Sequence, residues 1–342
     1  MLNVGLVGFG FATKVFHAPV IRAVTGLRLT TIVQRSGAGT DDPNYADVTF
    51  VRSVEDLLAR PVDLVVVATS NTSHHPIAKQ CLLAGRHVVV DKPFTVTMAE
   101  AEDLVRVGQE ARRVLSVYQE RRYTGDCVTV QKVISEGRLG RIVTFEHHFD
   151  RFRPELKPGA WRELKLPGSG VWYDLGPHLL DYALLVFGIP EAIGADIRIE
   201  RDGAVVDDAF DVTLHYPRMR AVLRGSMLAS GSAPTFVVHG TEGSFIKYGR
   251  DPQEGALKAG QTPDAPDWDR ESPELYGKLT TAEGTRVVPT VPANFTRYYE
   301  NVRDVILGKA PLAVTPAQAL DVMRGLLLAV VSSEQGSRVE WS

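Results

Sequence analysis

Three side chains have the types and spacing to polarise an oxygen atom and carry a proton: Lys92, Asp174 and His178. Lys92 follows an apolar run and precedes Pro93, which predicts a position at the carboxyl end of a strand, where open α/β sheets bind ligands. Its ammonium group could polarise a substrate oxygen and stabilise a developing alkoxide. His178 is the best candidate proton carrier, because an imidazole titrates near neutral pH.

Asp174 precedes His178 by four residues, so on one helical turn the two side chains would share a face. The carboxylate could then orient the imidazole or bind a substrate hydroxyl. Structural roles stay open for all three residues. Asp174 could be the N-cap of the helical run that follows it, Lys92 could be a surface lysine, and His178 could be a hydrogen-bonded structural histidine.

A glycine-rich turn lies directly after the first strand-like run and before a helical stretch. In a pyrophosphate-binding turn, the first glycine permits the tight bend, the second lets backbone amides approach the phosphates, and the helix N-terminus supplies free N–H groups. The third position is Thr13 rather than glycine or alanine, so the context must support the motif. That context predicts a dinucleotide site, and an ordinary strand–helix turn is the alternative. The expected cofactor contacts are Gly8, Gly10, Phe11, Ala12 and Thr13.

The end of the second predicted strand bears on the choice between NAD and NADP. NAD enzymes place an acidic residue there to hold the ribose hydroxyls, but no acid follows Val33 before Asp41. Guanidinium and hydroxyl donors suit the 2′-phosphate of NADP. Arg35 and Ser36 therefore favour NADP over NAD, although Arg35 could also be a solvated surface charge.

Metal and nucleophile motifs are not persuasive. His74–His75 and His147–His148 are adjacent pairs, which lack the i, i+4 spacing of a helical zinc site, and neighbours on a strand point to opposite faces. Gly168-Ser169-Gly170 is too short for a nucleophile elbow and is typical of a loop that approaches a ligand. We therefore expect no catalytic metal.

Residues 1–120 alternate strand-like and helical patterns, which predicts a parallel, doubly wound α/β sheet. The strand-like runs are apolar throughout, as strands covered on both faces should be. These runs are Val4–Val7, Leu29–Val33, Leu64–Ala68, His87–Val90 and Val114–Tyr118. The helices between them include His75–Leu83 and Met98–Ala111.

After residue 120, successive strand patterns without helices between them predict an antiparallel sheet in an α+β domain. The expected strands are Ile142–Phe149, Ala192–Glu200, Ala209–Tyr216, Ala221–Met227 and Phe236–Val238. Helices are expected over Thr124–Ser135, Phe295–Leu307 and Pro316–Ser332, the last with Thr315 as its N-cap. Asp251–Pro273 is rich in Pro, Gly, Asp and Gln and is expected to be a long loop.

Bulk composition excludes several classes of protein. Of 342 residues, 44% are hydrophobic and 23% charged, which is typical of a globular chain with about two domains. The net charge of −3 argues against a nucleic-acid binder. Two cysteines fit a reducing compartment. The apolar run Leu326–Val331 is too short to cross a bilayer and the N-terminus has no signal-peptide pattern, so we expect a cytoplasmic protein that does not bind membranes.

Several ordered motifs along essentially the whole chain resemble the glucose–fructose oxidoreductase / inositol dehydrogenase family. They are Gly8–Gly10, Ala68–Asn71 with His74, Asp91-Lys92-Pro93 (similar to the family's Glu-Lys-Pro), Trp161-Arg162, and Gly168–Gly170 followed by Asp174 and His178. Within the family, three local segments resemble NADP-dependent scyllo-inositol dehydrogenases: Phe16–Pro19, Gln119–Arg122 and His148–Pro154.

The resemblance implies a dinucleotide-binding domain, residues 1–120, and a domain of residues 121–342 with a large open, mainly antiparallel sheet. Because that sheet commonly forms a subunit interface, a homodimer or homotetramer is implied. The implied cofactor contacts are Thr69, Asn71, His74, Lys92, Gln119, Trp161 and Arg162. The implied substrate contacts are Lys92, Arg151, Asp174 and His178. His17, Asn71, His74, Gln119 and the Trp161–Arg162 pair could instead be mainly structural.

The function that follows is hydride transfer between NADP(H) and a CH–OH or C=O group of a cyclic polyol or sugar, with scyllo-inositol as the leading candidate. A reductase of another sugar, an aldehyde or a non-sugar substrate stays open, because Arg151 and Arg153 could equally hold a carboxylate or phosphate. A regulator that binds NADP without turnover is a further alternative, although neither Lys92 nor His178 is lost here.

Overall fold

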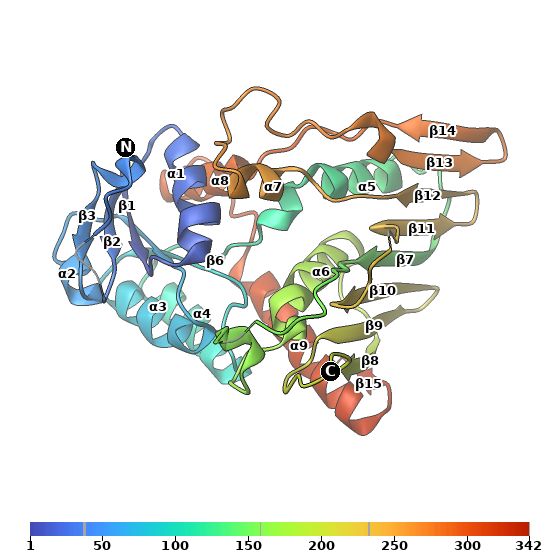
Figure 1. Ribbon diagram of the computed structural model, residues 1–342, viewed down its shortest axis with the longest axis horizontal. Helices are drawn as coiled ribbons and strands as arrows, with labels where there is room; N and C mark the ends of the chain where they lie inside the picture. The colour runs from blue at the N-terminus through green and yellow to red at the C-terminus, as the bar shows by residue number, and fades with distance from the viewer. Residues whose placement is uncertain (37–38, 158, 232, 342) are drawn as a thin grey trace. The chain divides into compact units, whose positions relative to one another are not determined.

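Six parallel strands form one sheet, in the order β3-β2-β1-β4-β5-β6 (Figure 1). Valine, leucine and isoleucine predominate in these strands, and β4 is buried along its whole length, as a sheet covered on both sides requires. The predicted parallel sheet is confirmed, and the short strand β3 is an addition to it. The strands are β1 (Leu2–Val7), β2 (Leu27–Val33), β3 (Thr49–Val51), β4 (Leu64–Val67), β5 (His87–Val90) and β6 (Leu115–Val117).

The computed structural model describes residues 1–36, 39–157, 159–231 and 233–341. It divides into two compact units. The first unit comprises Met1–Glu120, Gln253–Trp268 and Asn294–Leu320, and the second comprises Arg121–Pro252, Asp269–Ala293 and Asp321–Ser342. Two later segments therefore pack with residues 1–120 in the first unit.

Helices and helical turns connect the strands of the first unit. The predicted helices α3 and α4 are present within one residue of their expected starts, and α4 begins at a capping box in which Thr97 and Glu100 exchange side chain–backbone hydrogen bonds. The elements are a π-helical turn (Thr13–His17), α1 (Ala18–Ala23), α2 (Val54–Leu58), α3 (His74–Leu83), α4 (Met98–Glu110), and 3-10 turns at Pro43–Tyr45, Asn71–Ser73 and Glu120–Tyr123.

The later segments of the first unit contribute helices α7 (Gln253–Lys258) and α8 (Thr296–Ile306). Tyr298 of α8 donates a hydrogen bond to Ser116 of β6 (3.0 Å), which explains why α8 belongs to this unit. The expected loop over Asp251–Pro273 is wrong at α7. The Gln253 side chain is buried there and accepts hydrogen bonds from Trp268 Nε1 (3.1 Å) and the Phe295 amide (2.8 Å), so a polar residue holds the helix in place.

Nine strands form the sheet of the second unit, in the order β14-β13-β12-β11-β7-β10-β9-β8-β15 (Figure 1). All neighbours are antiparallel except β7 and β10, so the prediction of a mainly antiparallel sheet is confirmed. The strands are β7 (Ile142–His148), β8 (Ala192–Arg198), β9 (Ala209–Tyr216), β10 (Met219–Ser226), β11 (Phe236–Gly240), β12 (Gly243–Lys247), β13 (Gly277–Thr281), β14 (Gly284–Val288) and β15 (Val339–Glu340).

Helix α6 (Val171–Phe187) is the central helix of the second unit. Its Tyr182 hydroxyl donates to the Cys127 carbonyl of α5 (Gly125–Ser135) at 2.6 Å, and its Trp172 Nε1 donates to the Leu326 carbonyl of α9 (Pro316–Gln335) at 3.0 Å. Trp172 also packs edge-on against Phe210 of β9, with ring centroids 4.9 Å apart. These contacts fix α6, which carries Asp174 and His178. Two 3-10 turns, Trp161–Glu163 and Pro273–Leu275, complete the unit.

The N-terminus of α6 is capped from a distant loop. The Asp207 carboxylate accepts a hydrogen bond from the Trp172 amide (2.6 Å), and the Asp207 carbonyl accepts one from the Val171 amide (2.9 Å). The N-cap residue is Gly170, at φ 91°, where a side chain would collide with Asp207. The N-cap role considered for Asp174 is therefore wrong, because Asp174 lies inside the first turn.

The Thr315 N-cap of α9 is confirmed, since its hydroxyl accepts the Gln318 amide at 3.2 Å. At the other end of α9, the Ser332 and Ser333 hydroxyls accept the Ala195 and Ile197 amides of β8, each at 2.9 Å. They thereby cover part of the edge of the sheet. Over the ranges that the structure describes, no helix is long and apolar enough to cross a membrane.

Asp207 should make the stability of the protein depend on pH. Burial raises the pKa of this carboxyl from 3.8 to about 6, although three backbone hydrogen bonds oppose the rise. The folded state then binds more protons than the unfolded state between these two values, so the free energy of unfolding should fall as pH rises through this window and level off above it. We expect Asp207→Asn, which can still accept the Trp172 amide, to flatten this dependence in urea unfolding series at successive pH values.

The matched control for this variant is Asp202→Asn, which changes an exposed aspartate of the same loop. The control should keep the wild-type slope of stability against pH. A wild-type slope in Asp207→Asn would contradict the assignment.

Candidate functional site

The glycine turn after β1 leaves space where a dinucleotide would need it. Gly8 has φ 100°, and a Cβ atom there would collide with the carbonyl oxygen of Ala68 at the end of β4. Gly10 has no described heavy atom within 4 Å of its Cβ position, so its backbone faces open space. The chain becomes helical at Phe11, which is 60% exposed, and Ala12 follows it in the same turn. Backbone amides are thus available for a pyrophosphate.

Thr13 explains why this turn can do without a third glycine. Its side chain is fully buried, and its hydroxyl donates a 2.8 Å hydrogen bond to the Gly8 carbonyl. The third glycine of such motifs serves close packing of helix on strand. Here a hydrogen bond joins the helix to the turn instead, so the departure from the motif is compatible with the same backbone path.

The end of β2 presents the residues expected to select the cofactor. Arg35 and Ser36 are exposed and lie just beyond the strand, after Gln34. The neighbouring Gln34 has a buried Oε1 atom that lacks a hydrogen-bond partner among the described residues. Cationic and hydroxyl donors at this strand end suit a phosphate on the adenosine ribose.

Lys92 lies in the loop that follows β5, next to a cis peptide bond between Lys92 and Pro93. Its backbone amide donates to Asp91 Oδ1 (2.8 Å). On the other side, His74 is buried with Nδ1 2.9 Å from the Pro93 carbonyl oxygen and Nε2 3.3 Å from that of Thr69. The His74 imidazole thereby lies between the ends of β4 and β5. Burial lowers its pKa, so the neutral ring donates its one N–H to one of the two carbonyls.

Asp91 faces a second buried histidine. His17 is fully buried, with Nε2 3.7 Å from Asp91 Oδ2 and Nδ1 2.6 Å from the Tyr299 hydroxyl. Burial alone would raise the pKa of the Asp91 carboxyl, but the close contact and charge of His17, followed by the charges of Lys92 and His74, lower it below its ordinary value. Asp91 is therefore ionised at neutral pH beside Lys92.

Two further predicted residues lie at the same edge of the sheet. Asn71 is buried at the start of the 3-10 turn after β4. Gln119 follows β6, is 2% exposed, and has an Oε1 atom with no hydrogen-bond partner in the described part of the chain. Buried polar atoms are normally hydrogen-bonded, so Gln119 is suited to a ligand group. The open Gly10 backbone and the Gln34 and Gln119 oxygens fit a dinucleotide cofactor at this edge.

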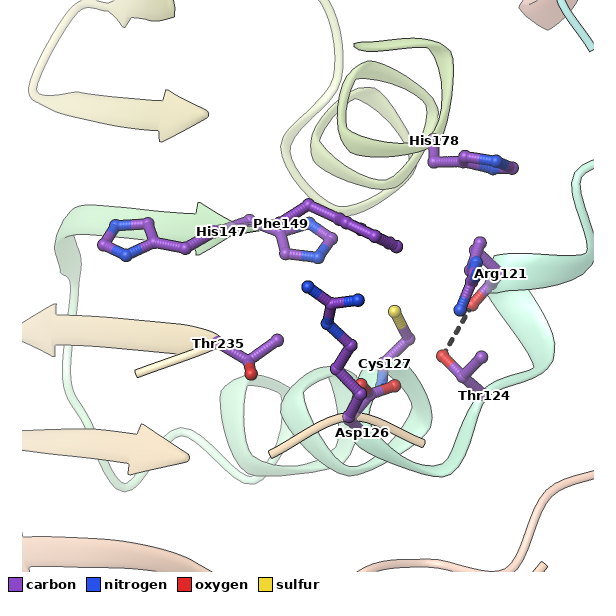
Figure 2. Close-up of a pocket in the computed structure, with 10 residues that line it drawn as sticks. Arg121, Thr124, Asp126, Cys127, His147, Phe149, His178 and Thr235 are labelled. Atoms are coloured by element: carbon purple, nitrogen blue, oxygen red, sulfur yellow. Dashed lines mark hydrogen bonds between the residues drawn. The ribbon is translucent and has the colours of Figure 1, made fainter. Parts of the chain in front are cut away.

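The second unit contains a pocket with an empty volume of about 360 Å³, part of it open to solvent. Figure 2 shows His178 entering it from α6, with Thr124, Asp126 and Cys127 contributed by α5 and its N-terminus. His178 is 5% exposed. Its place in a pocket, rather than in the closely packed core, fits a role in contact with substrate.

Arginine charge surrounds one aromatic ring beside this pocket. The guanidinium carbons of Arg250, Arg151 and Arg121 lie 4.4, 5.0 and 5.2 Å from the centroid of the Phe149 ring, within cation–π range. Arg121 and Arg250 line the pocket with Phe149. The pocket thus combines an imidazole, an aromatic ring and guanidinium groups.

Asp174 joins two of the predicted residues. Its Oδ2 atom lies 3.4 Å from Arg151 Nη1, and its Oδ1 atom lies 3.4 Å from Arg162 Nε. Arg162 in turn covers the Trp161 ring, with its guanidinium carbon 4.7 Å from the centroid. Asp174 is 17% exposed at its side chain, so its carboxylate stays within reach of a ligand.

The predicted residues therefore form two groups. The group in the first unit contains the glycine turn, Arg35, Ser36, Thr69, Asn71, His74, Lys92 and Gln119. The group in the second unit contains Arg151, Trp161, Arg162, Asp174 and His178. Within the ranges described, no group of three or more histidine, cysteine, aspartate or glutamate residues could hold a metal ion.

Sequence reasoning missed the other contributors to the pocket. Arg121 belongs to the Gln119–Arg122 segment, but no sequence motif includes Arg250 or Thr235. His147 also lines the pocket. It stacks on Phe236 with ring centroids 4.2 Å apart, and burial, with the charges of His148 and Arg121, lowers its pKa to about 3.

Comparison with known proteins gives matches along both units. Residues 2–119 match the family profile described as "Oxidoreductase family, NAD-binding Rossmann fold", and residues 131–341 match "Oxidoreductase family, C-terminal alpha/beta domain". The uncharacterized oxidoreductase YdgJ of Escherichia coli (strain K12) is 42% identical over 97% of this chain and 96% of its own.

A second relative and two solved structures extend the comparison. The scyllo-inositol 2-dehydrogenase (NADP(+)) IolW of Bacillus subtilis (strain 168) is 36% identical over 98% of this chain and 94% of its own. The structure of yvaA from Bacillus subtilis superposes with a TM-score of 0.95 at 35% identity, covering 99% of this chain and 98% of that one. An oxidoreductase from Bacillus cereus gives a TM-score of 0.89 at 33% identity, covering 99% and 98%.

Both parts of the chain are thus matched by profiles of one family, and relatives well above 30% identity span nearly its full length. The chain belongs to the Gfo/Idh/MocA family, the glucose–fructose oxidoreductase / inositol dehydrogenase family, and is an oxidoreductase with an NAD(P)-binding Rossmann domain.

Proposed function

We propose that the protein transfers a hydride between NADP(H) and the CH–OH or C=O group of a cyclic polyol or sugar, with an inositol as the leading substrate. The observation that carries this proposal is the position of Lys92. It follows β5 at the carboxyl edge of the parallel sheet, the same edge at which the Gly8–Thr13 turn follows β1. Ligands of open α/β sheets bind at this edge. The name of IolW, a scyllo-inositol 2-dehydrogenase, supports the choice of inositol.

The chain's own residues would position the substrate and manage its proton. When bound, the nicotinamide supplies or accepts the hydride. Lys92 would donate to the reacting oxygen and stabilise negative charge on it. His178 would exchange the hydroxyl proton. Asp174, ion-paired with Arg151 and Arg162, would accept hydrogen bonds from substrate hydroxyls.

NADP is the proposed cofactor because Arg35 and Ser36 are exposed at the end of β2, where an acidic residue would hold the ribose of NAD. Trp161, next to Arg162, remains a proposed contact near the nicotinamide.

We further propose that the protein forms a homodimer or homotetramer through the large antiparallel sheet. We also propose a cytoplasmic location. The free, buried thiols of Cys81 and Cys127 suit a reducing compartment.

A second substrate class within the same reaction is favoured by the arginines around Phe149. Guanidinium groups bind carboxylates in planar pairs, and Arg121 and Arg250 line the pocket that contains His178. A polyol that carries a carboxylate is therefore the second candidate. Assays that pair each neutral polyol with its sugar acid would distinguish the two classes.

Lys92→Met and His178→Ala should each reduce turnover by about 10²-fold or more, because each removes a group that stabilises charge or moves a proton in the transition state. Steady-state assays of NADPH formation with a panel of inositols, pentoses and hexoses would measure this effect. NADP binding, followed by fluorescence quenching, should persist in both variants.

Matched controls are Lys79→Met, a partly exposed lysine paired with Asp103, and His239→Ala, an exposed histidine bonded to Ser244. Both controls should keep wild-type turnover. Near-wild-type turnover in Lys92→Met and His178→Ala would refute the assigned roles. Tight NADP binding with no turnover of any substrate by the wild type would favour a regulator instead.

Arg35→Ala should raise the KM for NADP by roughly tenfold and change that for NAD by less than about twofold, because a charge-assisted hydrogen bond to the 2′-phosphate would be lost. Arg28→Ala is the control, since Arg28 is an exposed arginine near the other end of the same strand. Equal losses for both cofactors in Arg35→Ala, or a wild-type preference for NAD, would remove the proposed role.

A further inference from the structure

We infer that His17 and Tyr299 are positioning residues for the proposed reaction: Tyr299 fixes the proton of His17 on Nε2, and His17 holds the Asp91 carboxylate ionised beside Lys92. The inference rests on the proposed role of Lys92. Nothing in the sequence motifs of the site assigns a role to Tyr299, which lies 282 residues from His17 in the chain.

The three side chains form a buried series. The Tyr299 hydroxyl lies 2.6 Å from His17 Nδ1, and His17 Nε2 lies 3.7 Å from Asp91 Oδ2. His17 and Tyr299 are fully buried, and the Asp91 side chain is 16% exposed. The first distance is that of a strong hydrogen bond, whereas the second is longer than a hydrogen bond and is an ion-pair or ion–dipole contact.

Geometry selects the tautomer of His17. Burial, with the nearby phenols and carboxylates, raises the pKa of Tyr299 well above its ordinary value, so the phenol keeps its proton. If that proton is donated to Nδ1, the imidazole N–H lies on Nε2 and faces the Asp91 carboxylate. The other tautomer would turn the Nε2 lone pair toward the same anion, which is repulsive. An imidazolium form would also carry a proton on Nε2, so Asp91 faces an N–H in either charge state.

The Asp91 carboxylate then acts on its neighbour. Its Oδ2 atom faces His17, and its Oδ1 atom accepts the Lys92 backbone amide at 2.8 Å. This holds the start of the loop that carries the Lys92 ammonium, while His74 holds its far side through the Pro93 carbonyl (2.9 Å). A negative charge and a fixed backbone are thereby kept beside Lys92.

Other charged groups lie around this series and must be considered in any titration. The groups that face Asp91 or Tyr299 electrostatically are His17, His74, Lys92, Tyr118, Glu120 and Tyr298. The competing explanation is that His17 and Tyr299 serve only to pack the core. Both rings contact Tyr118, with ring centroids 4.3 Å apart for His17 and 5.4 Å apart for Tyr299. A Tyr299→Phe substitution separates the two explanations, because it retains the ring and removes only the hydroxyl.

The chain offers a matched control in the next residue. Tyr298 is 1% exposed in the same helix, and its hydroxyl is bonded to Ser116 Oγ (3.0 Å) rather than to His17. Tyr298→Phe therefore removes an equally buried hydroxyl from the same aromatic cluster. His17→Phe is the second test variant, because it removes the imidazole that faces Asp91.

The primary measurement is the carboxyl titration of Asp91 in the free protein, followed by NMR of protein labelled with ¹³C at aspartate carboxyls and assigned with Asp91→Asn. We expect the pKa of Asp91 to rise by about one unit, a tenfold change in proton affinity, in Tyr299→Phe and by more in His17→Phe. Tyr298→Phe should leave it unchanged. The acid limb of the pH profile of kcat/KM should move to higher pH in the same two variants, with the KM for NADP unaltered.

An unchanged Asp91 titration in folded Tyr299→Phe, or an equal rise in Tyr298→Phe, would overturn the inference. If His17→Phe fails to fold, Tyr299→Phe alone decides. Because the titration needs no substrate, its outcome is separate from that of the proposed function, which the turnover of Lys92→Met decides. A shifted titration combined with an unmoved acid limb would also overturn the positioning role.

Discussion

The carboxyl ends of parallel strands meet at one edge of a sheet, and the candidate cofactor site depends on this constraint. The turn after β1, the segment after β4, Lys92 after β5 and Gln119 after β6 are far apart in the sequence but neighbours in strand order. The arrangement requires glycine at position 8, because the Ala68 carbonyl after β4 occupies the space that a side chain there would need. If neighbouring strands ran antiparallel, the groups that follow them would lie at opposite edges.

Hydrogen bonds from buried polar side chains then fix the loops at this edge and the first turn of α6. Buried polar atoms that lack such a partner are available to bind ligands. His74 donates to one of the Thr69 and Pro93 carbonyls, Thr13 ties the first helix to Gly8, and Asp207 caps the helix that carries His178. Each of these contacts satisfies a backbone group that burial would otherwise leave unpaired at a cost of about 1–3 kcal/mol. Supporting contacts of this kind let a catalytic side chain keep one geometry without a contact of its own to the substrate.

Much of the fold and part of the site could be predicted from sequence, because their signals are local. Apolar runs predict the buried strands, and Asp91-Lys92-Pro93 can be identified from three adjacent residues. Strand β14 could not be predicted, since it is largely exposed and has no apolar alternation. The contact of His17 with Tyr299 and the grouping of Arg121 with Arg250 depend on chain segments that come together only in the folded state. The role of Thr13 could not be predicted either, because its hydroxyl forms a hydrogen bond to Gly8 at the position where such motifs usually have a glycine.

The central claim is direct hydride transfer from a polyol carbon to NADP. It is tested most directly by incubating the protein with NADP and an inositol that carries deuterium at every carbon, and by examining the reduced nicotinamide by NMR. Hydride transfer predicts deuterium at C4 of the nicotinamide on one face of the ring, with a slower rate than for the undeuterated substrate. Reduced cofactor that carries only protium at C4, or no reduction by any polyol in the presence of bound NADP, would contradict the claim.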